Sequence, residues 1–379
     1  MNKLLGTGLT ILTAGLMILI VGCGPGVSST AVPSSPPEVR PGPAVKLAFT
    51  TQPVGAVAGS DFEVQPVVAV EDAEGNVVTS YRGLVVLTIT ASTGVSEARL
   101  FGGTKVGLVN GMVEFKGLSI DKARAGYTLT ATSDTLLPAT STPLTILPGE
   151  PDKLVFTVLP SRGEAGAPLM PNPEVMVQDI YGNTVANFEG SVTISASVTY
   201  GDTNDPQTDP EISPVTLSGT TTVRMVNGVV RFTDISSKFA TIGYPLTLTA
   251  ASNYLASATS TPFAILPGAP AKLVFTVQPT GGEEGTPFEE QPKVAVKDIY
   301  GNVVSSSRAS ITLSITSDSG TAGAVLSGTT TLVADGGFFG GLAVFTDLSI
   351  DQAGSGYLLT ATSSGLTSAI SQAFDVSTP

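Results

Sequence analysis

One pattern repeats three times along most of the 379-residue chain. An apolar opening segment recurs as AVKLAFTTQP (44–53), PDKLVFTVLP (151–160) and PAKLVFTVQP (270–279). The segments PVVAVEDAEGN (66–76), PEVMVQDIYGN (173–183) and PKVAVKDIYGN (292–302) follow, and GYTLTATS (126–133), GYPLTLTAAS (243–252) and GYLLTATSS (356–364) come later. The aspartates Asp72, Asp179 and Asp298 are 107 and 119 residues apart. Such a period predicts three units of one fold.

Within each unit the residues alternate as they do in half-buried β-strands. VVLTIT (85–90), VTISAS (192–197) and ITLSIT (311–316) place apolar residues at every second position. Asn110-Gly111 and Asn227-Gly228 lie between such segments, which is the strongest short signal for a hairpin turn. We therefore expect an all-β protein of three tandem immunoglobulin-like β-sandwiches, each with about seven antiparallel strands and Greek-key connections.

The boundaries follow from the repeats and from composition. Residues 43–149, 150–268 and 269–379 are predicted as modules 1, 2 and 3. The segments LPGEP (147–151) and LPGAP (266–270) join them, and short proline-bounded joints favour a stiff rod. Residues 24–42 are rich in Pro, Ser and Gly and are predicted as a flexible tether.

The N-terminal residues 1–23 read as an export signal. Lys3 is followed by an apolar stretch, predicted as a signal helix, that ends in Ile20-Val21-Gly22-Cys23. This ending resembles a bacterial lipobox, and the resemblance implies that Cys23 is lipidated and cleaved from the signal peptide. An uncleaved membrane anchor is the alternative. In either case the modules are expected outside the cytoplasm, attached to the cell envelope, at the outer membrane if the host is Gram-negative.

The order of segments resembles a known family. An apolar strand, then V-x-V-x-D-x-x-G-N, alternating strands and G-Y-x-L-T-A are similar to the bacterial Ig-like repeats of the invasin and intimin type. The resemblance covers residues 43–379 and implies an adhesion-type surface protein. Tyr127, Tyr244 and Tyr357 resemble the tyrosine corner of Ig-like sandwiches, which implies a structural role for them.

Composition excludes several functions. The chain has no histidine, no tryptophan and one cysteine, so Ser-His-Asp and Cys-His catalysis and His-ligated metals are excluded. The pairs Glu283-Glu284 and Glu289-Glu290 are not placed as glycosidase carboxylates would be. We expect no enzyme. The net charge of −13 argues against nucleic-acid binding.

The D-x-x-G-N segments are the first candidate site. Carboxylate and amide oxygens are ligands for Ca²⁺, but the same residues also build tight turns, in which Asp bonds its own backbone. Turn chemistry is the favoured interpretation, because each segment supplies only two such side chains. The residues concerned are Asp72, Gly75, Asn76, Asp179, Gly182, Asn183, Asp298, Gly301 and Asn302.

Two features distinguish the copies. Module 2 contains an acidic insertion, TYGDTNDPQTDPEISP (199–214), whose Asp202, Asp205, Asp209 and Glu211 form either a solvated loop or a weak Ca²⁺ site. Module 3 carries Phe338-Phe339 in a glycine-rich tip, which either folds back or contacts a partner. No other cofactor is expected.

The sequence favours a lipid-anchored structural or interaction protein. Its predicted partners are the membrane, through the anchor, and an unknown protein or glycan at the cell surface. A carbohydrate- or wall-binding array and an accessory subunit of an envelope complex are the alternatives. The missing tryptophan weighs against the first of these, because sugar faces stack on aromatic rings.

Overall fold

A computed structural model describes residues 40–200, 211–241, 243–335 and 340–379. In these ranges the backbone forms strands and turns without α-helix, so the predicted all-β fold class is confirmed. The described part of the chain also holds no helix long and apolar enough to cross a membrane. The predicted signal helix, Cys23 and most of the tether lie outside the described residues.

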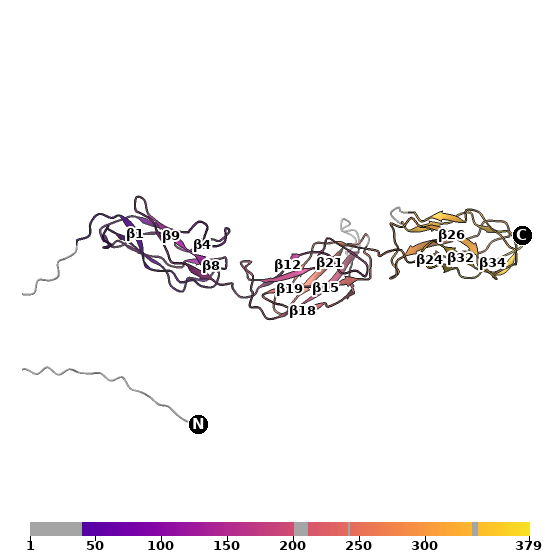
Figure 1. Cartoon of the computed structure of the whole chain (residues 1–379), viewed down its shortest axis with the longest axis horizontal. Helices are drawn as coiled ribbons and strands as arrows, with labels where there is room; N and C mark the ends of the chain where they lie inside the picture. The colour runs from indigo at the N-terminus through magenta and orange to yellow at the C-terminus, as the bar shows by residue number, and fades with distance from the viewer. Residues whose placement is uncertain (1–39, 201–210, 242, 336–339) are drawn as a thin grey trace, which may run out of the picture.

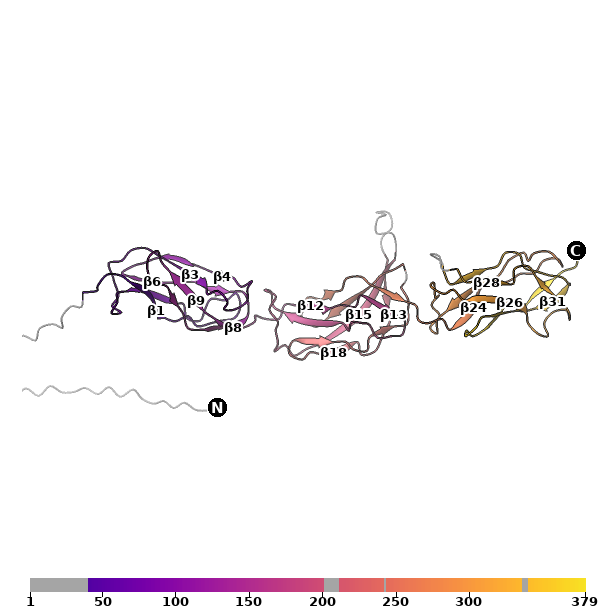
Figure 2. The same cartoon turned by 45° about the horizontal axis from the view of Figure 1, so that its top comes forward.

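The three modules lie end to end along one long axis (Figure 1; Figure 2). Each module has its own cluster of buried apolar side chains. Phe115, Phe232 and Phe345 occupy the same repeat position, and each is at most 1% exposed. Three separate cores mean that each module can hold its own fold, while the array depends on the contacts at the joints.

Module 1 contains a three-stranded sheet, β1-β2-β6, and a four-stranded sheet, β10-β9-β3-β5, with the small pairs β11-β8 and β4-β7 beside them. Its strands are β1 (Lys46–Thr51), β2 (Val67–Glu71), β3 (Leu84–Ile89), β4 (Leu100–Phe101), β5 (Lys105–Gly107), β6 (Met112–Glu114), β7 (Ser119–Ile120), β8 (Arg124–Tyr127), β9 (Leu129–Thr132), β10 (Ala139–Thr140) and β11 (Leu144–Ile146).

Module 2 repeats this plan with the sheets β12-β14-β19 and β16-β15-β21-β22, where β18 also pairs with β15. Its strands are β12 (Lys153–Val158), β13 (Arg162–Glu164), β14 (Glu174–Gln178), β15 (Ser191–Tyr200), β16 (Glu211–Val215), β17 (Leu217–Ser218), β18 (Thr222–Arg224), β19 (Val229–Arg231), β20 (Ser236–Ser237), β21 (Leu246–Ala251), β22 (Ala258–Thr259) and β23 (Ala264–Leu266).

Module 3 returns to the plan of module 1, with the sheets β24-β25-β29 and β28-β26-β32-β33. Its strands are β24 (Lys272–Val277), β25 (Lys293–Lys297), β26 (Ser310–Ile315), β27 (Leu326–Ser327), β28 (Thr331–Val333), β29 (Leu342–Val344), β30 (Ser349–Ile350), β31 (Gly354–Tyr357), β32 (Leu359–Thr362), β33 (Ala369–Ile370) and β34 (Phe374–Val376).

The connections cross between the two sheets of each sandwich. In module 1 the chain passes from β2 in one sheet to β3 in the other, and from β5 back to β6. The second crossing uses the predicted Asn-Gly turn, where Asn110 and Gly111 have φ of 51° and 73°. Asn227 and Gly228 take nearly the same angles in module 2. Both residues of such a turn need positive φ, which explains the Asn-Gly pairs.

Each module also joins an early segment to its last strand in parallel. In module 2, β13 pairs with β23 from Arg162↔Ala264 to Glu164↔Leu266. In module 1, Val57 bridges Leu147, and in module 3 Glu283 bridges Ser377, again in parallel. The entry and exit segments of every module are thus hydrogen-bonded to each other.

Tyr127 and Tyr357 are fully buried and close one end of their sandwiches. Each hydroxyl donates to the backbone carbonyl five residues upstream, Tyr127 to Lys122 and Tyr357 to Gln352, both at 2.9 Å. Each ring packs against a glycine, since a Cβ at Gly94 or Gly320 would lie within about 2 Å of ring atoms.

Tyr244 differs, although it occupies the same repeat position. Its side chain is 46% exposed, whereas Tyr127 and Tyr357 are fully buried. The reason lies in β15, which continues to Tyr200 and pairs with β16, whereas β3 and β26 end after six residues.

We expect Tyr357→Phe to destabilise module 3 by about 1 kcal/mol, because the partly buried carbonyl of Gln352 loses its hydroxyl donor. Hydrogen exchange of the amides in β26 and β32 measures the opening free energy of the module. Tyr254→Phe serves as the control, since Tyr254 is fully exposed. Equal effects of the two substitutions would contradict the prediction.

Candidate functional site

Two of the three D-x-x-G-N turns, those of modules 2 and 3, lie at the joints between modules. In each turn one aspartate, 0–1% exposed, is surrounded by N–H donors. Asp179 Oδ1 accepts from the backbone of Tyr181 (2.9 Å) and Asn183 (2.8 Å), and its Oδ2 accepts from Gly149 N and Asn183 Nδ2, both at 2.8 Å. Asp298 has the same four kinds of donor, from Tyr300, Gly268 and Asn302.

These N–H donors determine whether the aspartates can act as calcium ligands. Both oxygens of Asp179 and of Asp298 are occupied by N–H groups, which is the environment of a hydrogen-bonded anion and not of a calcium ligand. The described residues also hold no group of three or more acidic or cysteine side chains that could bind a metal ion. The geometry thus favours turn chemistry over Ca²⁺ at these positions.

In the turns of modules 2 and 3 the asparagine side chain bonds the preceding module across the joint. Asn183 Oδ1 accepts from Ala123 N at 2.8 Å, and its Nδ2 donates to Asp121 O at 2.9 Å, both in module 1. Asn302 makes the same pair of bonds with Ala240 N and Lys238 O of module 2. The turn itself is held by the aspartate, so one short segment connects the linker, the turn and the preceding module.

The tyrosine of each turn also reaches the preceding module. A Cβ at Gly59 would lie 2.1 Å from the hydroxyl oxygen of Tyr181, and one at Gly166 would lie 2.1 Å from that of Tyr300. Gly59 and Gly166 have φ of 77° and 81°, which favours glycine a second time. The tyrosine rings therefore pack directly against these glycines, and any side chain at the glycine position would displace the ring.

A lysine adds one further contact at each joint. Lys122 Nζ donates to Tyr181 O at 2.6 Å, and Lys238 Nζ lies 6.0 Å from the centre of the Tyr300 ring. We call residues 179–183 and 298–302 the joint turns. The end face of a module is the surface that receives a joint turn, formed by Gly59 and residues 121–123 in module 1, and by Gly166 and residues 238–240 in module 2.

The turn of module 1 has the same backbone but no module before it among the described residues. Asp72 accepts from Gly42 N (2.9 Å), Glu74 N and Asn76, as its counterparts do. In place of Ile-Tyr, however, this turn carries Ala73-Glu74. Among the described turns, tyrosine thus stands in the two that contact a preceding module, and Glu74 stands in the third.

Hydrogen bonds lower the pKa of the turn aspartates. Burial by itself raises the pKa of the Asp179 carboxyl, but the bonds from Asn183 and from the amides of Gly149 and Tyr181 together outweigh burial. The pKa of Asp298 is lowered in the same way, with Asn302 and Gly268 among its donors. The anionic form is therefore the one that fits these turns.

The other predicted site residues are only partly described. Asp202, Asp205 and Asp209, and also Phe338 and Phe339, lie outside the described residues. Glu211 is placed by its backbone, which pairs with Tyr200 across β15 and β16. The Ca²⁺ and partner-contact interpretations of these two segments therefore stay predictions.

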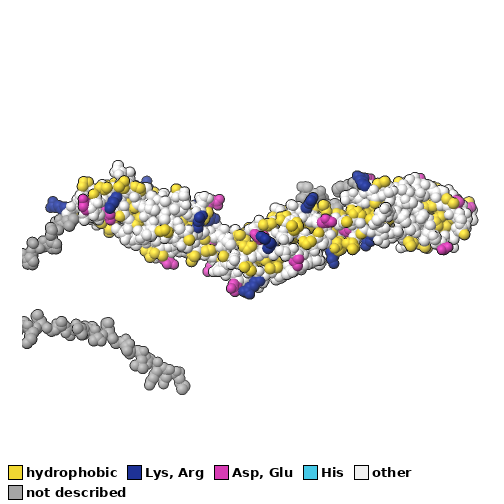
Figure 3. Space-filling model, in the orientation of Figure 1, with side chains coloured by type: hydrophobic (Ala, Val, Ile, Leu, Met, Phe, Trp, Pro, Cys, Tyr) yellow, Lys and Arg dark blue, Asp and Glu magenta, His cyan; other side chains and the backbone are white. Residues whose placement is uncertain are grey.

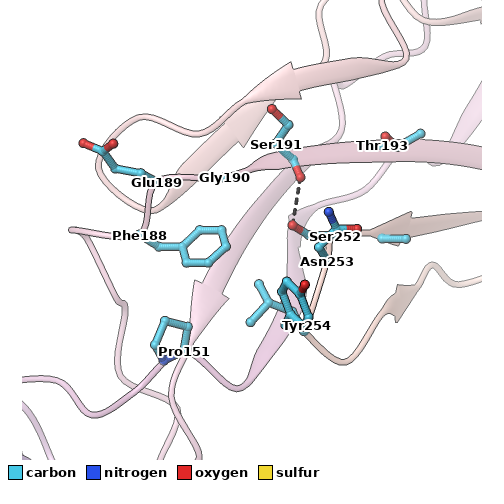
Figure 4. A pocket seen from close by; sticks show the side chains of 11 residues that line it. Pro151, Phe188, Glu189, Gly190, Ser191, Thr193, Ser252, Asn253 and Tyr254 are labelled. Atoms are coloured by element: carbon cyan, nitrogen blue, oxygen red, sulfur yellow. Dashed lines mark hydrogen bonds between the residues drawn. The ribbon is translucent and has the colours of Figure 1, made fainter.

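A hollow on module 2 has no counterpart in the sequence interpretation. It has a volume of about 770 Å³ and lies between the segment before β15 and the turn after β21. Phe188 and Tyr254 lie on opposite sides of it, with the hydroxyls of Ser191, Thr193 and Ser252 nearby (Figure 4). Ser252 Oγ donates to Ser191 O at 2.8 Å, which ties the two walls together.

Tyr254 is in an unusual conformation for a large side chain. Its φ is 66°, and its side chain is fully exposed. Module 3 has Gly365, with φ of 76°, at the same turn position, one residue before a leucine that packs on the core. Positive φ is costly for a bulky residue, so folding alone would favour glycine here.

The sequence already contained the signal for the joints. Tyr181 and Tyr300 are shared by the two modules that follow another module, whereas module 1 has Glu74 there. Gly59, Gly166 and Gly285 likewise recur before the second segment of each copy. Comparing the copies with each other for differences, and not only for identity, would have found both partners.

Comparison with known proteins returns similarity of structure alone. No family model and no curated protein matches the sequence. Among solved structures, the Escherichia coli adhesin FdeC is 15% identical, with 90% of this chain and all of that chain covered, at a TM-score of 0.34. Invasin, described as a bacterial integrin-binding protein, is 11% identical over 86% of this chain and 59% of its own, at a TM-score of 0.32.

A β-glycosidase from Bacteroides vulgatus is also similar, at 11% identity and a TM-score of 0.24, over 59% of this chain and 25% of that one. At these identities the similarity carries no argument about activity or partners.

We expect Gly166→Ala to loosen the joint between modules 2 and 3, because the methyl group displaces Tyr300. The hydrogen-exchange rate of the amides in residues 298–302 should rise about tenfold, which corresponds to a loss of about 1.4 kcal/mol in the free energy of opening the joint. Gly285→Ala is the matched control, since Gly285 has φ of 75° but no atom within 4 Å of the added Cβ. If both variants left these amides equally protected, the tyrosine contact would not hold the joint.

Acid should open the joints. The pKa of Asp179 and of Asp298 is lower in the folded protein than in the unfolded chain. Their contribution to the stability of the joints is therefore complete above the ordinary Asp pKa of about 3.9, and it is lost as the pH falls through the lower folded-state pKa. Small-angle X-ray scattering between pH 7 and pH 2 should report a bending chain before circular dichroism reports loss of strands. Loss of both signals at the same pH would contradict this order.

Proposed function

We propose that this protein is a non-enzymatic surface rod of the adhesion type, anchored by lipid at Cys23, which spaces or presents a binding surface away from the membrane. The joints support this proposal most directly. Each joint has two asparagine bonds across it, a tyrosine resting on a glycine, and a linker amide fixed by a buried aspartate. Such joints hold consecutive modules in line.

The character of the surface agrees with a spacer. Charged residues are 13% of the chain, and Figure 3 shows them scattered over the visible face, singly or in small groups of both signs. The described residues form five ion pairs, with at least one side chain of each pair 39% or more exposed, so they contribute little.

Cys23→Ser should release the protein from the membrane. The wild-type chain is expected in the detergent phase of a Triton X-114 partition and the variant in the aqueous phase, because the lipid supplies the membrane affinity. Melting of the modules is the control and should be unchanged. A wild-type chain that incorporates no labelled fatty acid would reject the lipid anchor, whichever phase the variant enters.

Glycan binding is the second candidate function, and the hollow beside Tyr254 favours it. An exposed aromatic ring at a costly φ, a second ring opposite and several hydroxyls are the groups that bind a sugar face and its hydroxyls. This arrangement partly offsets the missing tryptophan.

Tyr254→Gly should lower the affinity for insoluble cell-wall polysaccharide about tenfold, which corresponds to about 1.4 kcal/mol of binding free energy. Co-sedimentation with the polysaccharide measures this affinity. The variant should melt at or above the wild-type temperature, because glycine fits the positive φ that Gly365 has in module 3. Unchanged sedimentation would remove this second function and leave the spacer proposal intact.

A further inference from the structure

The end face of module 3 is built like those of modules 1 and 2. Gly59 N donates to Ile120 O, Gly166 N to Ser237 O and Gly285 N to Ile350 O, at 2.9, 2.7 and 2.7 Å. The next residues of each module form the surface that meets a joint turn. Asp351 and Ala353 therefore stand where Asp121 and Ala123 bind Asn183.

The place for a tyrosine ring is open on this face. A Cβ at Gly285 would meet no heavy atom within 4 Å, whereas one at Gly59 or Gly166 would strike a tyrosine. Gly285 nevertheless keeps the same left-handed backbone, with φ of 75°. The C-terminus lies at this end of module 3, away from module 2 (Figure 1).

The hydrogen-bond donor that would bind an asparagine, by contrast, is already occupied by a side chain of module 3 itself. Ala353 N donates to Glu284 Oε2 at 2.9 Å, and this N–H corresponds to those of Ala123 and Ala240, which donate to Asn183 and Asn302. The position of Glu284 is taken by Ala58 in module 1 and Ala165 in module 2. Of the three modules, module 3 alone has a side chain at this position long enough to accept from that N–H.

We propose that the end face of module 3 is a docking surface for the joint turn of a further Asp-Ile-Tyr-Gly-Asn module, and that Glu284 holds it closed by taking the acceptor place of that turn's asparagine. An incoming asparagine must displace a charged acceptor from Ala353 N, and charge-assisted hydrogen bonds are roughly twice as strong as neutral ones.

A second copy of this chain does not supply the matching turn. Its first module carries Ala73-Glu74 in place of Ile-Tyr, so Glu74 would stand where the tyrosine ring belongs, beside Glu284. Two carboxylates brought together repel each other. Both ends of the array therefore disfavour end-to-end stacking of copies, while the two internal joints remain matched.

The test adds a fourth module to the full-length chain. A second copy of residues 266–379 is appended directly after Val376, which occupies the position of Ile146 and Ile265 before the linkers. In a Cys23→Ser background, spin labels at Thr331→Cys of module 3 and at the same position of the added module report their distance distribution. Labels at Thr222→Cys and Thr331→Cys give the reference across the natural joint.

With Glu284 present, the distribution across the new joint should be much broader than the reference. With Glu284→Ala it should narrow to the reference width, because Ala is the residue of modules 1 and 2 at this position. A narrow distribution with Glu284 present would overturn the closure, and a broad one with Glu284→Ala would overturn the docking surface.

The reverse substitution keeps the proposal testable even if the four-module chain fails to fold. Ala165→Glu in the unextended chain places a carboxylate beside Ala240 N, where it competes with Asn302. The distribution across the natural joint should then broaden while the modules keep their strand content. An unchanged width in a folded Ala165→Glu chain would count against closure by Glu284.

Discussion

The buried carboxylates of Asp179 and Asp298 are the constraint on which the arrangement of the modules depends. An unpaired charge in this position would be very costly, but four N–H donors surround each aspartate. One donor belongs to the linker, and others belong to the turn and to its asparagine. Since that asparagine then bonds the preceding module, a single anion fixes three pieces of chain at once.

A joint of this kind needs little apolar surface. The tyrosine ring on a bare glycine and the two asparagine bonds are local contacts, made within a few residues of each linker. Large buried areas usually hold domains in a fixed relation. Here short linkers bring the joint turn close to its partner, so weak contacts act at high effective concentration.

The sequence predicted what is repeated and missed the differences that form the joints. The strands, the Asn-Gly turns and the sandwich followed from alternation and period, because each is fixed by local pattern. The function of Tyr181 at the joint was missed, because its partner Gly59 lies in another module and no local pattern reports it. Tyr244 was grouped with Tyr127 and Tyr357 on sequence position alone, although the longer β15 changes its surroundings.

The parallel pairing of entry and exit segments has a consequence for a chain under tension. A pull on the two ends of module 2 draws β13 and β23 in opposite directions along their own length. Their hydrogen bonds are then loaded together in shear, and the strands cannot separate one bond at a time. Modules 1 and 3 have the same arrangement at Val57–Leu147 and Glu283–Ser377. Each module is thus clamped across the point where force would enter and leave it.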